Sequence, residues 1–224
     1  MSTDLRESAV RVVVLVACSP SFCAGGDLKW MQAQMRRWRQ TRAAAAGALA
    51  MMLQAWNTLP QPVIGRIHGN ALGGGVGLAS TCDVAVGVDG ALMGLTETKL
   101  GLILATIGPY VIVRMGEASA RRVFMSSRQF SAQEAQQLGL LASVVPQDRL
   151  NSAVVAEVEP YLSCALGGVV EAKSLARFVG PKTDSQAIEM TISALVSQWG
   201  GDAAGQGIAT FFAKTPPPSV GGDH

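Results

Sequence analysis

This sequence of 224 residues has few histidines, no C-x-x-C pair and few charged residues. Each of these shortages argues against a particular kind of binding site or cellular location. Its four cysteines, Cys18, Cys23, Cys82 and Cys164, form no C-x-x-C pair, and only two histidines accompany them. The sequence therefore contains no pattern typical of a zinc site. The sequence shows no secretory signal pattern and no apolar run of membrane-spanning length. We expect a cytoplasmic protein with reduced thiols and no membrane partner.

Charged residues make up only 15% of the chain, while hydrophobic residues make up 49% and the net charge is +2. A charge this small does not supply the basic surface that nucleic-acid backbones require, so we expect no nucleic-acid partner. The length fits one substantial domain with an appendage. The excess of apolar over charged residues predicts that part of the surface is buried between subunits.

A strand, a glycine turn and a helix follow one another twice in the first third of the chain. Residues 10–18 are nearly all apolar and predict a strand buried on both faces, followed by FCAGGDL, in which Asp27 is a good helix N-cap. The second set is a strand at 62–67, the loop HGNALGGG at 68–75 and a helical turn at 76–81.

Such turns can bind negative charge, because glycine lets backbone N–H groups approach a ligand and a helix N-terminus adds a positive dipole end. Two converging donors would form an oxyanion hole. Tight turns or close packing would explain either glycine segment equally well when it is taken alone. Neither segment is a P-loop, since no GxxxxGK[ST] is present.

The rest of the sequence predicts further strands and then helices. A capping box, Ser131 to Glu134, begins a short helix that Gly139 ends. Strands are predicted at 83–88, 91–95 and 140–145, and helices at 42–59, 109–116, 148–163, 167–178, 184–199 and 202–213. We divide the chain into a core at 1–147, a helical region at 148–214 that packs against neighbouring subunits, and a loose tail at 215–224.

Three motifs in order, FCAGGDLKWM, GNALGGGVGLASTCD and GLTETKLGL, resemble the crotonase (enoyl-CoA hydratase/isomerase) superfamily, nearest its methylglutaconyl- and isohexenylglutaconyl-CoA hydratase-like branch. The resemblance runs from about residue 10 to residue 214. It implies an α/β fold, the ClpP/crotonase spiral of ββα units, with a C-terminal helical region that forms a trimer or a dimer of trimers. It also implies an acyl-CoA substrate and no metal or cofactor, CoA being part of the substrate. The family's first strand and helix find no match in the core.

The resemblance assigns roles to individual residues. The backbone N–H groups of Gly26 and Gly74 would hold the thioester oxygen as it becomes negative, and Glu97 would move protons. Burial in an apolar pocket would raise the pKa of Glu97 into a useful range. The resemblance further places the substrate beside Ala24, Asp27, Leu28, Leu72, Gly73 and Gly77.

Gly77 is the main departure from the family, whose hydratases carry a second glutamate there. A single glutamate suffices for moving a proton between C2 and C4, which favours an isomerase or a specialised hydratase. The alternative is a degenerate member that only binds acyl-CoA or a partner subunit. Leu104 and Gly108 replace a proline and a serine of the branch, so the resemblance does not predict the shape of the acyl-pocket wall. Serine-peptidase chemistry would rest on His68, and a lone histidine is more often structural.

Overall fold

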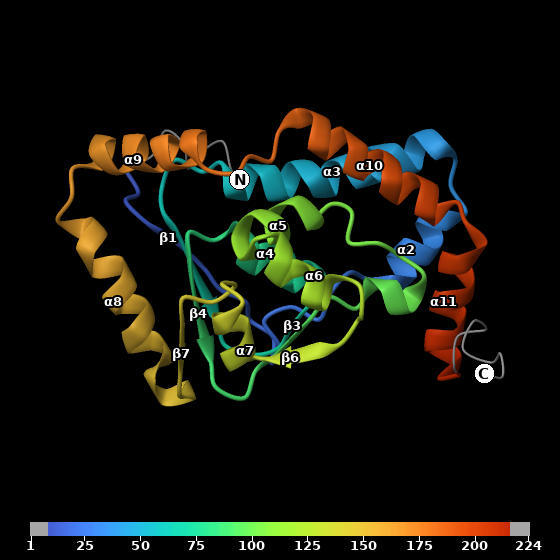
Figure 1. Cartoon of the computed structure of the whole chain (residues 1–224), viewed down its shortest axis with the longest axis horizontal. Coiled ribbons are helices and arrows are strands. Elements are labelled where there is room, and N and C mark those ends of the chain that lie inside the picture. The colour runs from blue at the N-terminus through green and yellow to red at the C-terminus, as the bar shows by residue number, and fades with distance from the viewer. Residues whose placement is uncertain (1–8, 216–224) are drawn as a thin grey trace.

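The computed structural model describes residues 9–215, so the predicted tail lies outside the described residues except for Thr215. Two small sheets form the centre of the molecule (Figure 1). The first has four parallel strands in the order β1 (Val13–Leu15), β2 (Val63–Ile67), β4 (Val84–Val88) and β7 (Ser143–Val145). The second has β3 (Ala71–Leu72) parallel to β5 (Leu92–Gly94), which pairs antiparallel with β6 (Gln129–Ser131).

Consecutive repeats place one strand in each sheet and then turn into a helix. In one repeat β2 and β3 lead into α4 (Gly74–Thr81), and in the next β4 and β5 lead into the 3-10 turn η1 (Glu97–Leu100). An earlier repeat has β1, a single parallel bridge from Cys23 to Ala71, and then α2 (Leu28–Met35). Because these second-sheet segments run parallel and side by side, the turns that follow them lie at one edge of the sheet.

Helices surround the two sheets. Along the chain they are α3 (Arg39–Asn57), α5 (Gly108–Met115), α6 (Glu117–Phe124), α7 (Ala132–Gln137), η2 (Gln147–Arg149), α8 (Leu150–Leu162), α9 (Leu166–Val179), α10 (Ser185–Trp199) and α11 (Asp202–Ala213). The main core packs side chains from both sheets against α4 and α5, with Ile64, Val76, Val86 and Val111 fully buried. Figure 1 shows α10 lying along α3, while α8 and α9 lie at the opposite end of the molecule from α11.

Local signals in the sequence explain several boundaries. The Asp27 carboxylate accepts hydrogen bonds from the N–H groups of Lys29 and Trp30 at the start of α2, as the N-cap prediction requires. Ser131 Oγ accepts from the N–H of Glu134, but the Glu134 carboxylate pairs with Arg128 and does not complete the capping box. The predicted C-terminal helices are confirmed as α8 to α11, each within two residues at either end.

The first strand differs from its prediction. Residues 10–18 were expected to form a strand buried on both faces, yet β1 spans only three residues and Val14 and Val16 are exposed. The reason is the strand's place at the edge of the four-stranded sheet, where it pairs with β2 alone and alternate side chains point outward.

The C-terminal helices pack unequally on the rest of the chain. Helices α10 and α11 share a second core with α3 and the segment after η1, in which Trp199, Ile208 and Leu102 are buried. Helix α9 leaves Leu175, Phe178 and Val179 exposed. Helices α10 and α11 therefore complete the core of their own chain. The division of the chain at residue 148 stays a prediction.

In the described part of the chain, residues 9–215, no single helix is both long and apolar enough to span a membrane. Residues 147–162 and α9 reach the required length and composition only together, as a pair of helices bent by 107°.

Candidate active site

A pocket of about 440 Å³ opens where the turns of the three repeats meet. Its walls come from the loop before α2, the start of α4, the turn η1 and the last turns of α11. Its lining includes Ala24, Gly26, Leu28, Leu72, Gly73 and Glu97. Residues that are more than 180 positions apart in the sequence thus share one cavity.

Hydrogen bonds between neighbouring backbones hold the first two turns together. The N–H of Cys23 donates to the carbonyl of Asn70 at 3.1 Å, and the N–H of Leu72 donates to the carbonyl of Cys23 at 2.8 Å. A Cβ on Gly75 would stand 2.9 Å from both Cβ and the carbonyl oxygen of Cys23. Glycine at position 75 therefore allows α4 to begin directly against the loop that leads to Gly26.

Two backbone donors stand at this junction. Helix α4 begins at Gly74, whose N–H is one of the first-turn donors that an α-helix leaves without an internal partner. Within residues 9–215 the N–H groups of Gly26 and Gly74 donate to no other group of the chain. Both are therefore available to an acceptor bound in or beside the pocket.

Glu97 begins η1 directly after β5 and is the acid of the pocket. Its carboxyl lies beside Gly73, whose N–H donates to the carbonyl of Gly94 at 2.7 Å and so ties the two turns together. Glu97 Oε2 is buried and has no hydrogen-bond partner in the described part of the chain. A buried carboxyl oxygen without a partner is costly unless the group is protonated or a ligand supplies one.

Burial raises the pKa of Glu97 to about 7, because loss of water disfavours the carboxylate. Hydrogen bonds from the backbone of Glu97 and Thr96 offset part of this effect. The group therefore exchanges its proton near neutral pH, which suits a general acid or base.

Helix α11 closes the pocket by close contact with η1. A Cβ on Gly207 would stand 2.3 Å from the carbonyl oxygen of Leu100, and one on Gly101 would stand 2.4 Å from that of Ala203. Two glycines therefore let the backbones touch, which brings Phe211 and Lys214 to the pocket wall. From the sequence we expected the helix at 202–213 to pack against neighbouring subunits. Gly207, inside a helical pattern, was the local signal for the close contact with η1.

The nine residues expected at the site fall into two groups. Ala24, Gly26, Leu28, Leu72, Gly73 and Glu97 line the pocket, whereas Asp27, Gly74 and Gly77 are not among its lining residues. Asp27 caps α2 with its carboxylate, and Gly74 lies one residue beyond the lining Gly73. Sequence reasoning did not single out Thr96, Gln129, Thr210 or Phe211, which also line the pocket.

Gly77 lies beneath Ile107 in the interior. A Cβ on Gly77 would stand 2.4 Å from Ile107 Cγ2 and 2.7 Å from Ile107 Cβ, and both residues are buried. Leu104, one of the departures from the branch, is buried in the main core rather than in the pocket wall. The Ile107 side chain therefore fills the space beside Gly77, where the resemblance led us to expect that hydratases carry a second glutamate.

His68 takes part in no catalytic arrangement visible in the described chain. Its Nε2 lies 2.7 Å from the carbonyl oxygen of Ser19, and its ring meets that of Phe22 edge to face. It does not line the pocket of Glu97. Among residues 9–215 no group of three or more histidine, cysteine or acidic side chains could hold a metal ion.

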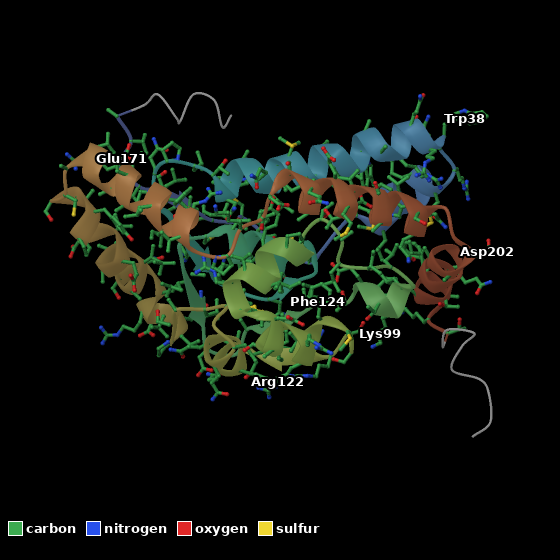
Figure 2. The ribbon with its side chains drawn as sticks, turned by 45° about the horizontal axis from the view of Figure 1, so that its top comes forward. Trp38, Lys99, Arg122, Phe124, Glu171 and Asp202 are labelled. Carbon is green, nitrogen blue, oxygen red and sulfur yellow. The ribbon has the colours of Figure 1, made fainter. Side chains whose placement is uncertain are left out.

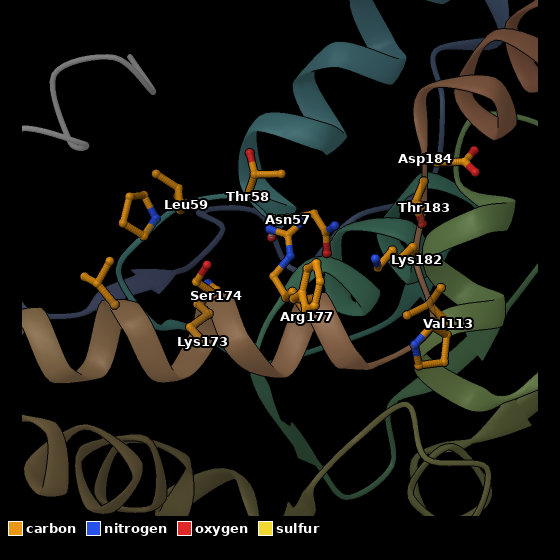
Figure 3. A pocket seen from close by; sticks show the side chains of 14 residues that line it. Asn57, Thr58, Leu59, Val113, Lys173, Ser174, Arg177, Lys182, Thr183 and Asp184 are labelled. Atoms are coloured by element: carbon orange, nitrogen blue, oxygen red, sulfur yellow. Dashed lines mark hydrogen bonds between the residues drawn. The ribbon is translucent and has the colours of Figure 1, made fainter.

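A second pocket, of about 530 Å³, lies between α9 and the end of α3 (Figure 3). Lys173 reaches from α9 to Asp83 Oδ2 at 2.6 Å and to the carbonyl oxygen of Gln61 at 2.9 Å. Arg177 donates to the carbonyl oxygen of Asn57. This pocket has neither a glycine turn nor a buried carboxyl without a partner among its lining residues, so it is the weaker candidate for chemistry.

The chain is similar to known proteins over nearly its whole length. Residues 3–218 match the sequence model described as enoyl-CoA hydratase/isomerase. A mevalonyl-coenzyme A hydratase of Aspergillus fumigatus is 30% identical over 219 residues, covering 94% of this chain and 78% of the relative. The mitochondrial methylglutaconyl-CoA hydratase of Rattus norvegicus is 35% identical over 153 residues, 66% of this chain and 46% of the relative.

Solved structures agree in fold. An enoyl-CoA hydratase of Shewanella pealeana superposes with a TM-score of 0.76 at 29% identity, covering 97% of this chain and 82% of that one. The expected crotonase fold is confirmed, as is the resemblance to the superfamily and to its methylglutaconyl-CoA hydratase branch.

Proposed function

Because the chain belongs to the enoyl-CoA hydratase/isomerase family, we propose that Glu97 moves protons on an enoyl-CoA thioester held at Gly26 and Gly74. The observation that carries the proposal is the buried, unpartnered Oε2 of Glu97 in a pocket lined by both glycine turns. The substrate is an acyl-CoA, in keeping with the family.

The chemistry that we propose for the chain's own groups is a proton transfer. The ionised Glu97 removes a proton from the carbon next to the thioester or its vinylogous position, and the thioester oxygen gains negative charge. The N–H groups of Gly26 and Gly74 donate to that oxygen, and each such donor typically contributes about 3 kcal/mol. The carboxyl then returns the proton to the other carbon, so that the double bond shifts and nothing is oxidised or reduced. The step needs no cofactor beyond the CoA of the substrate.

Isomerisation between the 2,3 and 3,4 positions is the leading reaction in this proposal. Hydration in the usual manner would use a second carboxyl to activate water, and Ile107 fills the space above Gly77 where that group would stand. Relatives that carry hydratase names act on mevalonyl- and methylglutaconyl-type acyl groups. We extend the proposal to such branched or glutaconyl-type substrates, whose own polar groups could hold the water.

A panel of straight, branched and glutaconyl-type enoyl-CoA esters tests this proposal. Each ester is assayed for hydration and for positional isomerisation with the natural chain and with Glu97→Gln. We expect isomerisation by the natural chain and a loss of about 10²-fold or more in Glu97→Gln, with acyl-CoA binding retained. Equal turnover by the two proteins would refute the role of Glu97.

Binding without turnover is a second candidate function, and the filled position at Gly77 favours it. A chain of this kind would bind acyl-CoA in calorimetry and turn over no ester of the panel. Acyl-CoA binding should survive Glu97→Gln under either function, so turnover of the panel by the natural chain decides between them.

We also propose that the chain self-associates as a trimer or a dimer of trimers. The exposed Leu175, Phe178 and Val179 on α9 support an apolar contact at that end of the molecule. Light scattering coupled to size exclusion tests this, and a monomer at micromolar concentration would contradict it. Action in the cytoplasm stays a prediction.

A further inference from the structure

The turn that carries Glu97 is held from outside the pocket by a small hydrogen-bonded cluster. Ser127, in the segment between α6 and β6, accepts a hydrogen bond from the N–H of Lys99 at 2.9 Å. Its hydroxyl also bonds that of Thr98, and Thr98 Oγ1 lies 3.2 Å from the carbonyl oxygen of Met125. Figure 2 labels Lys99 on this turn, and Figure 1 shows the segment after α6 leading to β6.

These hydrogen bonds give every hydroxyl of the cluster a partner within the protein, without water. If Ser127 donates to Thr98 Oγ1 and Thr98 donates to the carbonyl of Met125, every hydroxyl proton has an acceptor and Ser127 Oγ still accepts from Lys99. A connected set of this kind restricts rotation more strongly than its separate bonds would. We call these bonds of Ser127, Thr98, Lys99 and Met125 the Ser127 clamp.

The backbone at Ser127 has a conformation that residues other than glycine rarely adopt. Its φ is +52°, and besides Lys214 it is the residue other than glycine with positive φ in the described chain. Such a conformation is uncommon for L residues and persists where the surroundings impose it, often at functional sites. The Ser127 side chain is also buried, and its hydroxyl contacts Thr98 and Lys99 of η1.

The clamp completes a frame around Glu97. Strand β5 leads into Glu97, and β6 follows Ser127, with Gly94 paired to Gln129 between them. On the other side the backbone of α11 contacts Leu100 and Gly101. Glu97 thus lies between two supports, of which the clamp is the one made by side-chain hydrogen bonds.

We propose that Ser127 is a positioning residue that holds η1 so that the Glu97 carboxyl stays in the pocket against Gly73. This inference rests on the proposed function of Glu97 and adds the group that keeps it in place. Without the clamp, η1 would have freedom to rotate outward, and the carboxyl would gain water. Displacement of a reacting group by about 1 Å can reduce the rate 10²-fold.

Two substitutions separate positioning from stability. Ser127→Gly removes the hydroxyl but suits the positive φ, so the melting temperature should not fall. Thr98→Val removes the second hydroxyl with little change of shape, and Thr98→Ser keeps it as the conservative rescue. Ser126→Gly is the matched control, because Ser126 is exposed, lies one residue earlier and has no hydrogen bond in the described chain.

The decisive measurement is a ¹³C NMR titration of the Glu97 carboxyl in the full chain, with its signal assigned by its loss in Glu97→Gln. In the natural chain and in Ser126→Gly the midpoint should lie near 7, whereas in Ser127→Gly and Thr98→Val it should fall toward 4.5. On the active enzyme the same two variants should lose about tenfold or more in kcat with little change in KM. Thr98→Ser should retain both values.

Unshifted titration of Glu97 in both Ser127→Gly and Thr98→Val would overturn the inference. So would a kcat that falls only in step with the melting temperature. If the natural chain turns over none of the acyl-CoA panel, the proposed function fails, but the titration still decides whether Ser127 fixes the environment of Glu97.

Discussion

The carboxyl group of Glu97 lies against the backbone of Gly73, so closely that a Cβ on residue 73 would stand 2.7 Å from Glu97 Oε1. Gly73 also has a φ of +50°, which L side chains rarely adopt. One glycine therefore provides both the turn that begins α4 and the space for the acid. The two turns depend on each other although 24 positions separate the two residues in the sequence.

Gly73→Ala should consequently reduce activity more than stability. The new methyl group would force the Glu97 carboxyl out of place, and we expect about a 10²-fold lower kcat. The positive φ should cost about 1 kcal/mol in the free energy of unfolding. Steady-state kinetics and urea unfolding measure the two effects. Gly168→Ala on α9, where a Cβ would meet nothing within 4 Å, is the matched control and should retain full activity.

Gly77→Glu should not by itself create an ordinary two-glutamate hydratase. The added Cβ would meet Ile107 at 2.4 Å, and overpacking of this kind costs about 1–3 kcal/mol before the burial of a carboxyl is counted. We expect a lower melting temperature and no gain in crotonyl-CoA hydration.

The double variant Gly77→Glu/Ile107→Ala opens the space that the glutamate needs. It should recover part of the melting temperature relative to Gly77→Glu and show hydration that Ile107→Ala alone lacks. Gain of hydration by Gly77→Glu without any loss of stability would contradict the packing described here.

The pKa of Glu97 predicts a specific dependence of stability on pH. Because its pKa rises from 4.5 to about 7 on folding, the folded state holds the proton more tightly. The resulting stabilisation is complete below pH 4.5 and is lost as the pH rises to about 7. Relative to Glu97→Gln, the natural chain should lose about 3 kcal/mol of unfolding free energy over that range. Urea unfolding at pH 4.5, 5.5, 6.5 and 7.5, as test conditions spaced by about one unit, would refute this if the difference between the two proteins stayed constant.

The motifs of the sequence were sufficient to predict the fold and six of the residues that line the pocket, Ala24, Gly26, Leu28, Leu72, Gly73 and Glu97. Gly26, Gly73 and Glu97 each follow a second-sheet segment, so parallel pairing alone brings their turns to one edge. The N-cap at Asp27 and the C-terminal helices followed from local signals that depend little on the rest of the fold.

Other features depend on contacts between distant segments and could not be read from the sequence. Gly207 against Leu100 is visible only once α11 packs on η1, and Ile107 over Gly77 only once α5 packs on α4. The positive φ of Ser127 has no signal in a residue type that is common in turns of every kind. The strand at 10–18 was judged buried because its composition cannot tell an edge strand from a central one.

The ion pair of Lys173 and Asp83 should fix α9 to the core. The Lys173 side chain is 11% exposed and its Nζ bonds both Asp83 and Gln61. Lys173→Met should lower the free energy of unfolding on the order of 2 kcal/mol, since the partly exposed Asp83 loses its cation. Lys182→Met, in the same pocket but stacked on Phe178, is the control and should change stability little. Equal melting temperatures for the two variants would contradict this role.

Exchange of substrate hydrogen for solvent deuterium tests the central claim most directly. The natural chain and Glu97→Gln are each incubated with an enoyl-CoA ester in D₂O, and deuterium at C2 and C4 is measured by mass spectrometry and NMR. If Glu97 moves the proton between the two carbons and its carboxyl exchanges that proton with solvent before returning it, the natural chain incorporates deuterium. Glu97→Gln, which still binds the ester, does not. Incorporation at the same rate by both proteins would contradict the account.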